Sequence, residues 1–126
     1  MKHRDKISVK DIERVTINLQ IYCQYTSDDK LGGWVAVVNQ EGAPWQMHTN
    51  NQDLEALMRN VAGEVIIRQR IIKPWYNIIL TEGPFPRKEG MVQYTAKPPE
   101  DIKRKVIKYL KYEKEELADK MFKAAT

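Results

Sequence analysis

The chain has 126 residues and a formal net charge of +4, with 21 Lys and Arg against 17 Asp and Glu. This length predicts one domain over residues 1–126, and no apolar run approaches the roughly 20 residues that span a bilayer. The charged N-terminus is unlike a secretory signal and the single Cys23 cannot build a disulfide framework, so we expect a cytoplasmic protein without a membrane partner.

The first half of the chain predicts three short strands after a polar leader at residues 1–13. Apolar and polar residues alternate from Val15 to Gln24, which is typical of a strand with one face in the core. Gly32 and Gly33 open a second strand that continues through residues 34–38, and residues 45–48 form a third. Because the connections are short, these strands predict an antiparallel meander.

The spacing of apolar residues then changes to that of a helix. Asn50 or Asn51 is the expected N-cap, and the apolar stripe consists of Leu54, Leu57, Met58, Val61 and Val65. A strong apolar strand follows at residues 75–81. Returning from a helix to a strand in this way predicts a crossover onto the same sheet.

The last third of the chain predicts one more strand and a helical segment. The strand covers residues 91–96, and the loop of residues 83–90 before it is too short for a helical crossover, so we expect a hairpin with the preceding strand. Residues 99–125 are expected to be helical, with apolar positions at Ile102, Val106, Leu110, Leu117, Met121 and Phe122. The chain is therefore predicted to be α/β (α+β) with a mixed sheet.

Three segments resemble the ribonuclease HI family, and a fourth resembles it more weakly. Ile21–Thr26 followed by Gly32–Val38 is similar to the family's first strand, which carries Asp-Gly-Ser, and its Gly-Gly second strand. Thr49–Leu57 is similar to the Thr-Asn-Asn-x-x-Glu-Leu opening of its first helix. Ile78–Gly83 is similar to a fourth strand that ends in Asp-Ser, and Glu115–Ala118 to the Asp-x-Leu-Ala of its last helix. The resemblance implies a three-layer ribonuclease-H-like fold.

In that family, clustered carboxylates hold two divalent cations that activate water and stabilise the leaving oxygen of a phosphodiester. The resemblance places the first Asp on Gln24, a neutral amide, and the helix Glu on Leu54, or on Glu55 if one residue is inserted. The other two carboxylates fall on Glu82 and Glu115. It therefore implies Glu55, Glu82 and Glu115 as candidate catalytic residues, and Glu55, Glu82 and Asp28 as candidate metal ligands. Mg²⁺ or Mn²⁺ is expected only if catalysis survives, and otherwise no cofactor.

A run of cations near the C-terminus is the main sequence signal for a polyanionic partner. The expected nucleic-acid contacts there are Lys103, Arg104, Lys105, Lys108 and Lys111, with Asn50 and Asn51 added from the first helix opening. The run is also what the solvated face of an amphipathic helix looks like. Alternatively, the run binds phosphates and replaces the basic substrate-binding region of the family from another place in the chain.

These observations favour a catalytically impaired ribonuclease-H-like domain that binds nucleic acid, either an RNA–DNA hybrid or double-stranded RNA, or a protein of nucleic-acid metabolism. Two alternatives stay open. One is a divergent but active Mg²⁺- or Mn²⁺-dependent nuclease, because charge remains at up to three of the four carboxylate positions. The other is a protein-interaction module with no nucleic-acid role, which an exposed apolar patch would favour.

Overall fold

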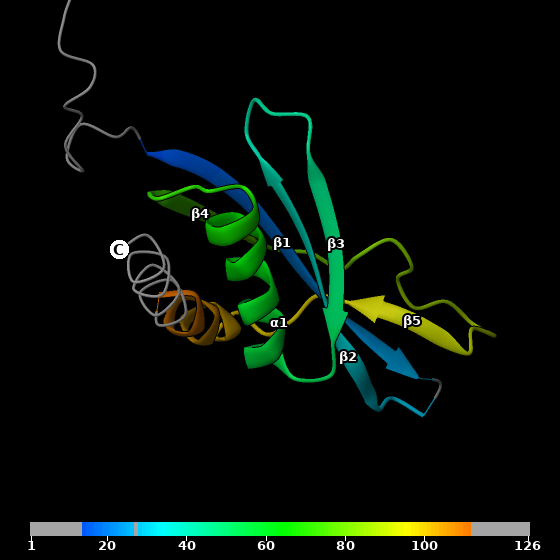
Figure 1. Cartoon of the computed structure of the whole chain (residues 1–126). Helices are drawn as coiled ribbons and strands as arrows, with labels where there is room; N and C mark the ends of the chain where they lie inside the picture. The colour runs from blue at the N-terminus through cyan, green and yellow to red at the C-terminus, as the bar shows by residue number, and fades with distance from the viewer. Residues whose placement is uncertain (1–13, 27, 112–126) are drawn as a thin grey trace, which may run out of the picture.

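The computed structural model describes residues 14–26 and 28–111. Its elements are β1 (Val15–Thr26), β2 (Leu31–Gln40), β3 (Gln46–Asn51), α1 (Leu54–Ala62), the π-helix η3 (Gly63–Arg68), β4 (Pro74–Leu80) and β5 (Gln93–Ala96), followed by a helix over residues 102–111 (Figure 1). The predicted leader at 1–13 and the C-terminal segment after residue 111, including Glu115, Leu117, Met121 and Phe122, lie outside the described residues.

The sheet confirms the predicted meander and crossover. Its strand order is β3-β2-β1-β4, with β2 antiparallel to both β1 and β3. After α1 and η3 the chain returns to the sheet as β4, which pairs in parallel with β1 from Val15 opposite Pro74 to Ile21 opposite Leu80. The fold is thus mixed α+β, with one parallel pair created by the crossover helix.

The predicted hairpin between β4 and the next strand is wrong. β5 pairs antiparallel with β1, with Cys23 opposite Ala96 and Thr26 opposite Gln93. The reason is the length of β1, which continues for several residues beyond Ile21, where its pairing with β4 ends. The same edge of β1 therefore accepts β4 along its first half and β5 along its second half.

The core lies on one face of the sheet, beneath two helices. Odd positions of β1 point into it, and the predicted helix stripe is buried in full (Ile17, Leu19, Ile21, Leu54, Leu57, Met58, Val61, Val65). Ile102, Val106 and Leu110 of the C-terminal helix join the same cluster, as their spacing predicted. The described residues therefore form two layers, and the three-layer arrangement stays a prediction.

Helix α1 begins later than predicted. β3 extends to Asn51, and the N-cap is Asp53, whose side chain accepts a hydrogen bond from the Glu55 amide. Asn51 acts one step earlier, since its Oδ1 accepts from the Asp53 amide at 2.9 Å. Asn51 and Asp53 thus each accept a backbone hydrogen bond where the chain passes from β3 into the helix. Asn and Asp are both good N-caps, so the spacing of apolar residues alone does not show which of them caps the helix.

Candidate nucleic-acid interface

The carboxylates expected at a metal centre lie on separate elements. Glu55 is in the first turn of α1, with Oε1 3.7 Å from Nη2 of Arg59, and Glu82 is exposed beyond the end of β4. Gln24 is exposed at an even position of β1, and even positions point away from the face that α1 covers. The sheet therefore lies between the Gln24 side chain and α1.

Asp28, the fourth candidate ligand, is engaged in the turn between β1 and β2. Its carboxylate accepts a hydrogen bond from the Thr26 hydroxyl and lies 3.7 Å from Nζ of Lys30. The Thr26 hydrogen bond lowers the pKa of Asp28. Across residues 14–26 and 28–111 no three His, Cys, Asp or Glu side chains are grouped so that they could hold a metal ion. Glu55, Glu82 and Asp28 are therefore not brought together as a metal site, and Glu115 lies outside the described residues.

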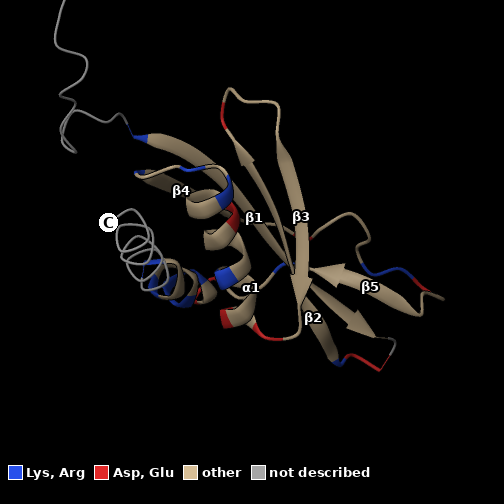
Figure 2. Ribbon diagram, viewed as in Figure 1, with Lys and Arg blue, Asp and Glu red and all other residues tan. Residues whose placement is uncertain are grey.

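The helix over residues 102–111 carries the predicted cations on its outer surface. Arg104, Lys105, Lys108 and Lys111 are exposed, opposite the buried Ile102, Val106 and Leu110. Lys103 differs, because it is half-buried and its Nζ lies 2.9 Å from Oε1 of Glu100. Figure 2 shows this helix as the main concentration of blue among the helices. Arg104, Lys108 and Lys111 are spaced by four and three residues and so form one stripe.

The stripe ends beside an exposed tryptophan. Trp75 on β4 is 54% exposed, and Lys111 shares with it a groove of about 370 Å³ between β4 and the C-terminal helix. The Arg14 guanidinium carbon lies 4.4 Å from the centroid of the Trp75 ring. Lys73 lines the same surface recess as Arg14 and Trp75. One exposed indole is thus bordered by three cations that come from three separate parts of the chain.

Trp75 belongs to the sheet face that no helix among the described residues covers. None of the five strands contains a Lys, Arg, Asp or Glu, and in Figure 2 they are tan throughout. Across this face Asn18 donates to Asn39 and accepts from Asn77, each at 3.1 Å. Such a row offers amide groups and apolar surface, with charge confined to its border.

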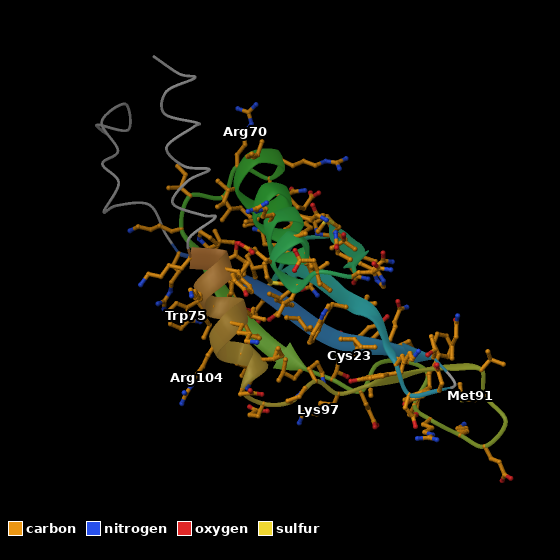
Figure 3. The ribbon with its side chains drawn as sticks, turned by 90° about the horizontal axis from the view of Figure 1, so that it is seen from below. Cys23, Arg70, Trp75, Met91, Lys97 and Arg104 are labelled. Atoms are coloured by element: carbon orange, nitrogen blue, oxygen red, sulfur yellow. The ribbon has the colours of Figure 1, made fainter. Side chains whose placement is uncertain are left out.

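The end of the sheet farthest from Trp75 contains a second recess. It has a volume of about 450 Å³ and is lined by Gln24, Phe85, Met91 and residues of β5. Figure 3 shows Met91 and Trp75 at opposite ends of the molecule, and Arg104 on the side of Trp75. Gln24 therefore lies far from the cationic stripe, at the end of the sheet that carries the exposed Phe85.

The two predicted asparagine contacts have different surroundings. Asn50 is exposed on β3, on the same sheet face as Trp75, whereas Asn51 is half-buried and bonded to the start of α1. Asn50 remains available to a ligand, and Asn51 has a structural role.

Sequence reasoning missed Arg14 and Lys73, and it favoured packing in the core or on the sheet face for Trp75, with stacking on bases as the lesser alternative. A Trp in an apolar strand is ordinarily core. The available signal was the alternation within residues 74–80, which separates Trp75, Asn77 and Ile79 from the inward-facing positions.

Comparison with protein-family models, with curated proteins and with solved structures finds no match to this chain. Within the described part of the chain, no helix has the length and apolar character needed to cross a membrane.

Proposed function

We propose that this domain binds nucleic acid, with the cationic stripe of Arg104, Lys108 and Lys111 on the phosphate backbone and Trp75 against a base or sugar. The single observation that carries the proposal is the position of Trp75, more than half exposed and bordered by Arg14, Lys73 and Lys111. An exposed aromatic ring inside a group of cations suits nucleic acid, because every nucleotide offers both a π-face and a negative charge.

We expect electrostatic attraction to contribute most of the affinity and base stacking to contribute the rest. Each phosphate neutralised by Lys or Arg releases counterions, so the affinity falls steeply as salt increases. A stacked base adds about 1–3 kcal/mol with little dependence on sequence. The amide row of Asn18, Asn39 and Asn77 continues from Trp75 across the uncharged sheet and offers hydrogen-bonding groups to bases.

The ribonuclease-H-like identity forms the second part of the proposal. Its support is the strand order β3-β2-β1-β4, with an antiparallel meander and a β4 that returns parallel to β1 after a helix. The described residues give little support for the catalytic carboxylates of that family. Gln24 is an amide at one of these positions, and Glu55 at another lies next to Arg59. We therefore propose a binding domain in which this catalytic arrangement has been lost.

The test compares binding and cleavage in the same tubes. Labelled single-stranded RNA, double-stranded RNA and an RNA–DNA hybrid are titrated with the full chain at several salt concentrations, with Mg²⁺ or Mn²⁺ present. The test variant replaces Arg104, Lys108 and Lys111 with Gln. The control variant replaces Lys30, Arg68 and Lys88 with Gln, which removes the same charge from exposed positions elsewhere.

We expect salt-sensitive binding by the unmodified chain. The affinity of the stripe variant should fall at least tenfold, and that of the control variant should change little. Equal losses in both variants would mean that only net charge matters, and the site would be wrong. Absence of binding to all three probes would overturn nucleic-acid binding altogether. Metal-dependent cleavage that Glu82→Gln abolishes would replace the impaired domain with an active nuclease.

A further inference from the structure

The outer edge of β4 is unpaired and uncharged within the described residues. Within the described residues β4 is the last strand of the sheet, so no strand pairs with its outer side. Strand β4 contains no charged residue, and its only proline is Pro74 at the first position. Edge strands normally carry charged residues or prolines, because an open row of N–H and C=O groups recruits other chains.

Apolar side chains gather at this edge. Of the eight large apolar residues that are exposed in the described part of the chain, four lie on or beside β4: Ile72, Trp75, Ile79 and Ile107. Their exposed fractions together equal about two complete side chains, on the order of 400 Å² at the size of an aromatic residue. β3, the opposite edge of the sheet, has none of the eight. The apolar edge is therefore specific to β4.

The hydrogen bonds to β1 determine which backbone groups of β4 point outward. The Lys73 carbonyl accepts from Val15, and the Thr81 amide donates to the Ile21 carbonyl. In a parallel pair, alternate residues form backbone hydrogen bonds with the neighbouring strand. The N–H and C=O groups at odd positions of β4 therefore point toward β1. The N–H and C=O groups of Tyr76, Ile78 and Leu80 then point away from the sheet, where an added strand would meet them.

We propose that the occupant of this edge is a second copy of the chain, paired through β4 in the antiparallel direction with Asn77 on the two-fold axis. This register joins Tyr76 to Ile78 of the partner subunit through a pair of reciprocal backbone hydrogen bonds. Trp75 then lies beside Ile79 of the partner subunit on the sheet face without helices, an aromatic and β-branched pair of the kind that stabilises sheets. The same patch meets itself, as a two-fold interface requires.

Charge beyond the strand ends fits the same register. Antiparallel pairing brings the start of one β4, where Lys73 and Arg14 lie, next to the end of the other, where Glu82 follows Leu80. Two basic residues thus face an acidic one at each end of the interface. A parallel arrangement would instead place the basic ends together, which costs free energy.

The C-terminal helix supplies a second layer to the interface. Ile107 is about half exposed and borders the groove beside β4 together with Trp75 and Ile78. Two copies related by an axis through Asn77 carry their helices on the same face of the joined sheet. The four exposed apolar side chains supply on the order of 400 Å² per subunit, against about 800 Å² for a standard interface, and the strand edge adds the backbone hydrogen bonds.

The test uses charge at the proposed axis. Asn77 is exposed and donates to Asn18 of its own subunit, and across the axis it lies opposite its own copy, so one substitution acts twice. Asn77→Lys and Asn77→Asp are prepared separately and also mixed, and the masses are measured by light scattering over a range of concentrations. The control is Gln46→Lys, an exposed position on the β3 edge. No nucleic acid is present, so the outcome is independent of the proposed function.

The unmodified chain is expected at twice its 14.8 kDa mass. Each charged variant should dissociate with a dissociation constant at least tenfold higher, because like charges oppose each other. The mixture should recover the dimer, and the control should remain dimeric. A chain that is monomeric at every concentration would overturn the proposal. So would a dimer that both charged variants retain, or a mixture that stays monomeric.

Discussion

The Arg14 guanidinium carbon lies 4.4 Å from the centroid of the Trp75 ring, directly joining the first described residue to the start of β4. Two segments that are 61 positions apart meet here because β1 and β4 begin side by side, with Val15 opposite Pro74. At an exposed site such a cation–π contact is worth about 0.5–1 kcal/mol. It holds the indole in a defined orientation while leaving most of it open to solvent.

Trp75 should therefore dominate the solvent-accessible fluorescence of the protein. Trp34 and Trp45 are half-buried against the core, and Trp45 donates its ring N–H to Gln40. Trp75→Phe is expected to remove most of the emission that acrylamide quenches, whereas Trp45→Phe removes little of it. Stern–Volmer measurements on the two variants make the comparison. Equal quenching in the two variants would show that Trp75 is covered.

Gly83 should be the least replaceable glycine of the described chain. Its φ is +78°, and an added Cβ would lie 2.7 Å from both Thr95 Oγ1 and Tyr22 Cδ2. Thr95 cannot move away freely, since its hydroxyl accepts from the Phe85 amide at 2.9 Å and it is buried. Gly83→Ala should lower the free energy of unfolding by about 1–2 kcal/mol for the left-handed backbone and about 1–3 kcal/mol more for the clash.

Gly42→Ala is the matched control for that substitution. Gly42 has a φ of +81° but nothing within 4 Å of the added Cβ. Only the backbone part of the cost, about 1–2 kcal/mol, should therefore appear. Urea unfolding of both variants gives the difference. Identical losses would mean that the loop holding Gly83 relaxes without cost.

Asp53 should contribute more to the start of α1 than Asn50, the predicted cap that makes no hydrogen bond to the helix start within the described residues. It has extended backbone angles, and its carboxylate accepts from the Glu55 amide at 3.3 Å. Asp53→Ala is expected to reduce stability by about 1 kcal/mol, and Asp53→Asn to restore most of it. Asn50→Ala should change stability by less than about 0.5 kcal/mol, as for ordinary surface positions. Denaturant midpoints measure all three, and a larger effect at Asn50 would place the cap one turn earlier.

Cys23 should make folding sensitive to alkaline pH. It is buried on β1, and burial raises the pKa of its thiol to about 11. The thiol is neutral in both states well below its ordinary pKa of about 9, so its contribution to stability is complete there. Above that pH only the unfolded chain ionises, and stability should fall by up to about 1.4 kcal/mol per pH unit until about pH 11.

A Cys23→Ala variant isolates this effect from other groups that titrate in the same range. The free energy of unfolding is measured from pH 8 to pH 11 for both proteins, and the difference between them should shrink or reverse as pH rises. In the native protein at pH 8, a thiol reagent should react more slowly than after unfolding. A constant difference between the two curves would show that the folded thiol ionises normally.

Local sequence patterns determined most of the elements. The alternation in residues 15–24 and the helical stripe from Leu54 to Val65 both predicted which face is buried. The structure buries every apolar residue of these two patterns except Val15, which is partly buried. These signals are reliable because side-chain direction follows directly from the period of the backbone. The cations of residues 103–111 were likewise evident from the sequence, and their helix places most of them in solvent.

Tertiary structure decided how the elements combine. The pairing of β5 with β1 depends on how far β1 extends past β4, and the joining of Arg14, Lys73, Trp75 and Lys111 depends on strand order and on the helix beside β4. Neither is encoded in any local window. Contacts between residues distant in sequence arise only when whole elements bury their apolar faces together, and it is those contacts that create both the candidate interface and the open edge of β4.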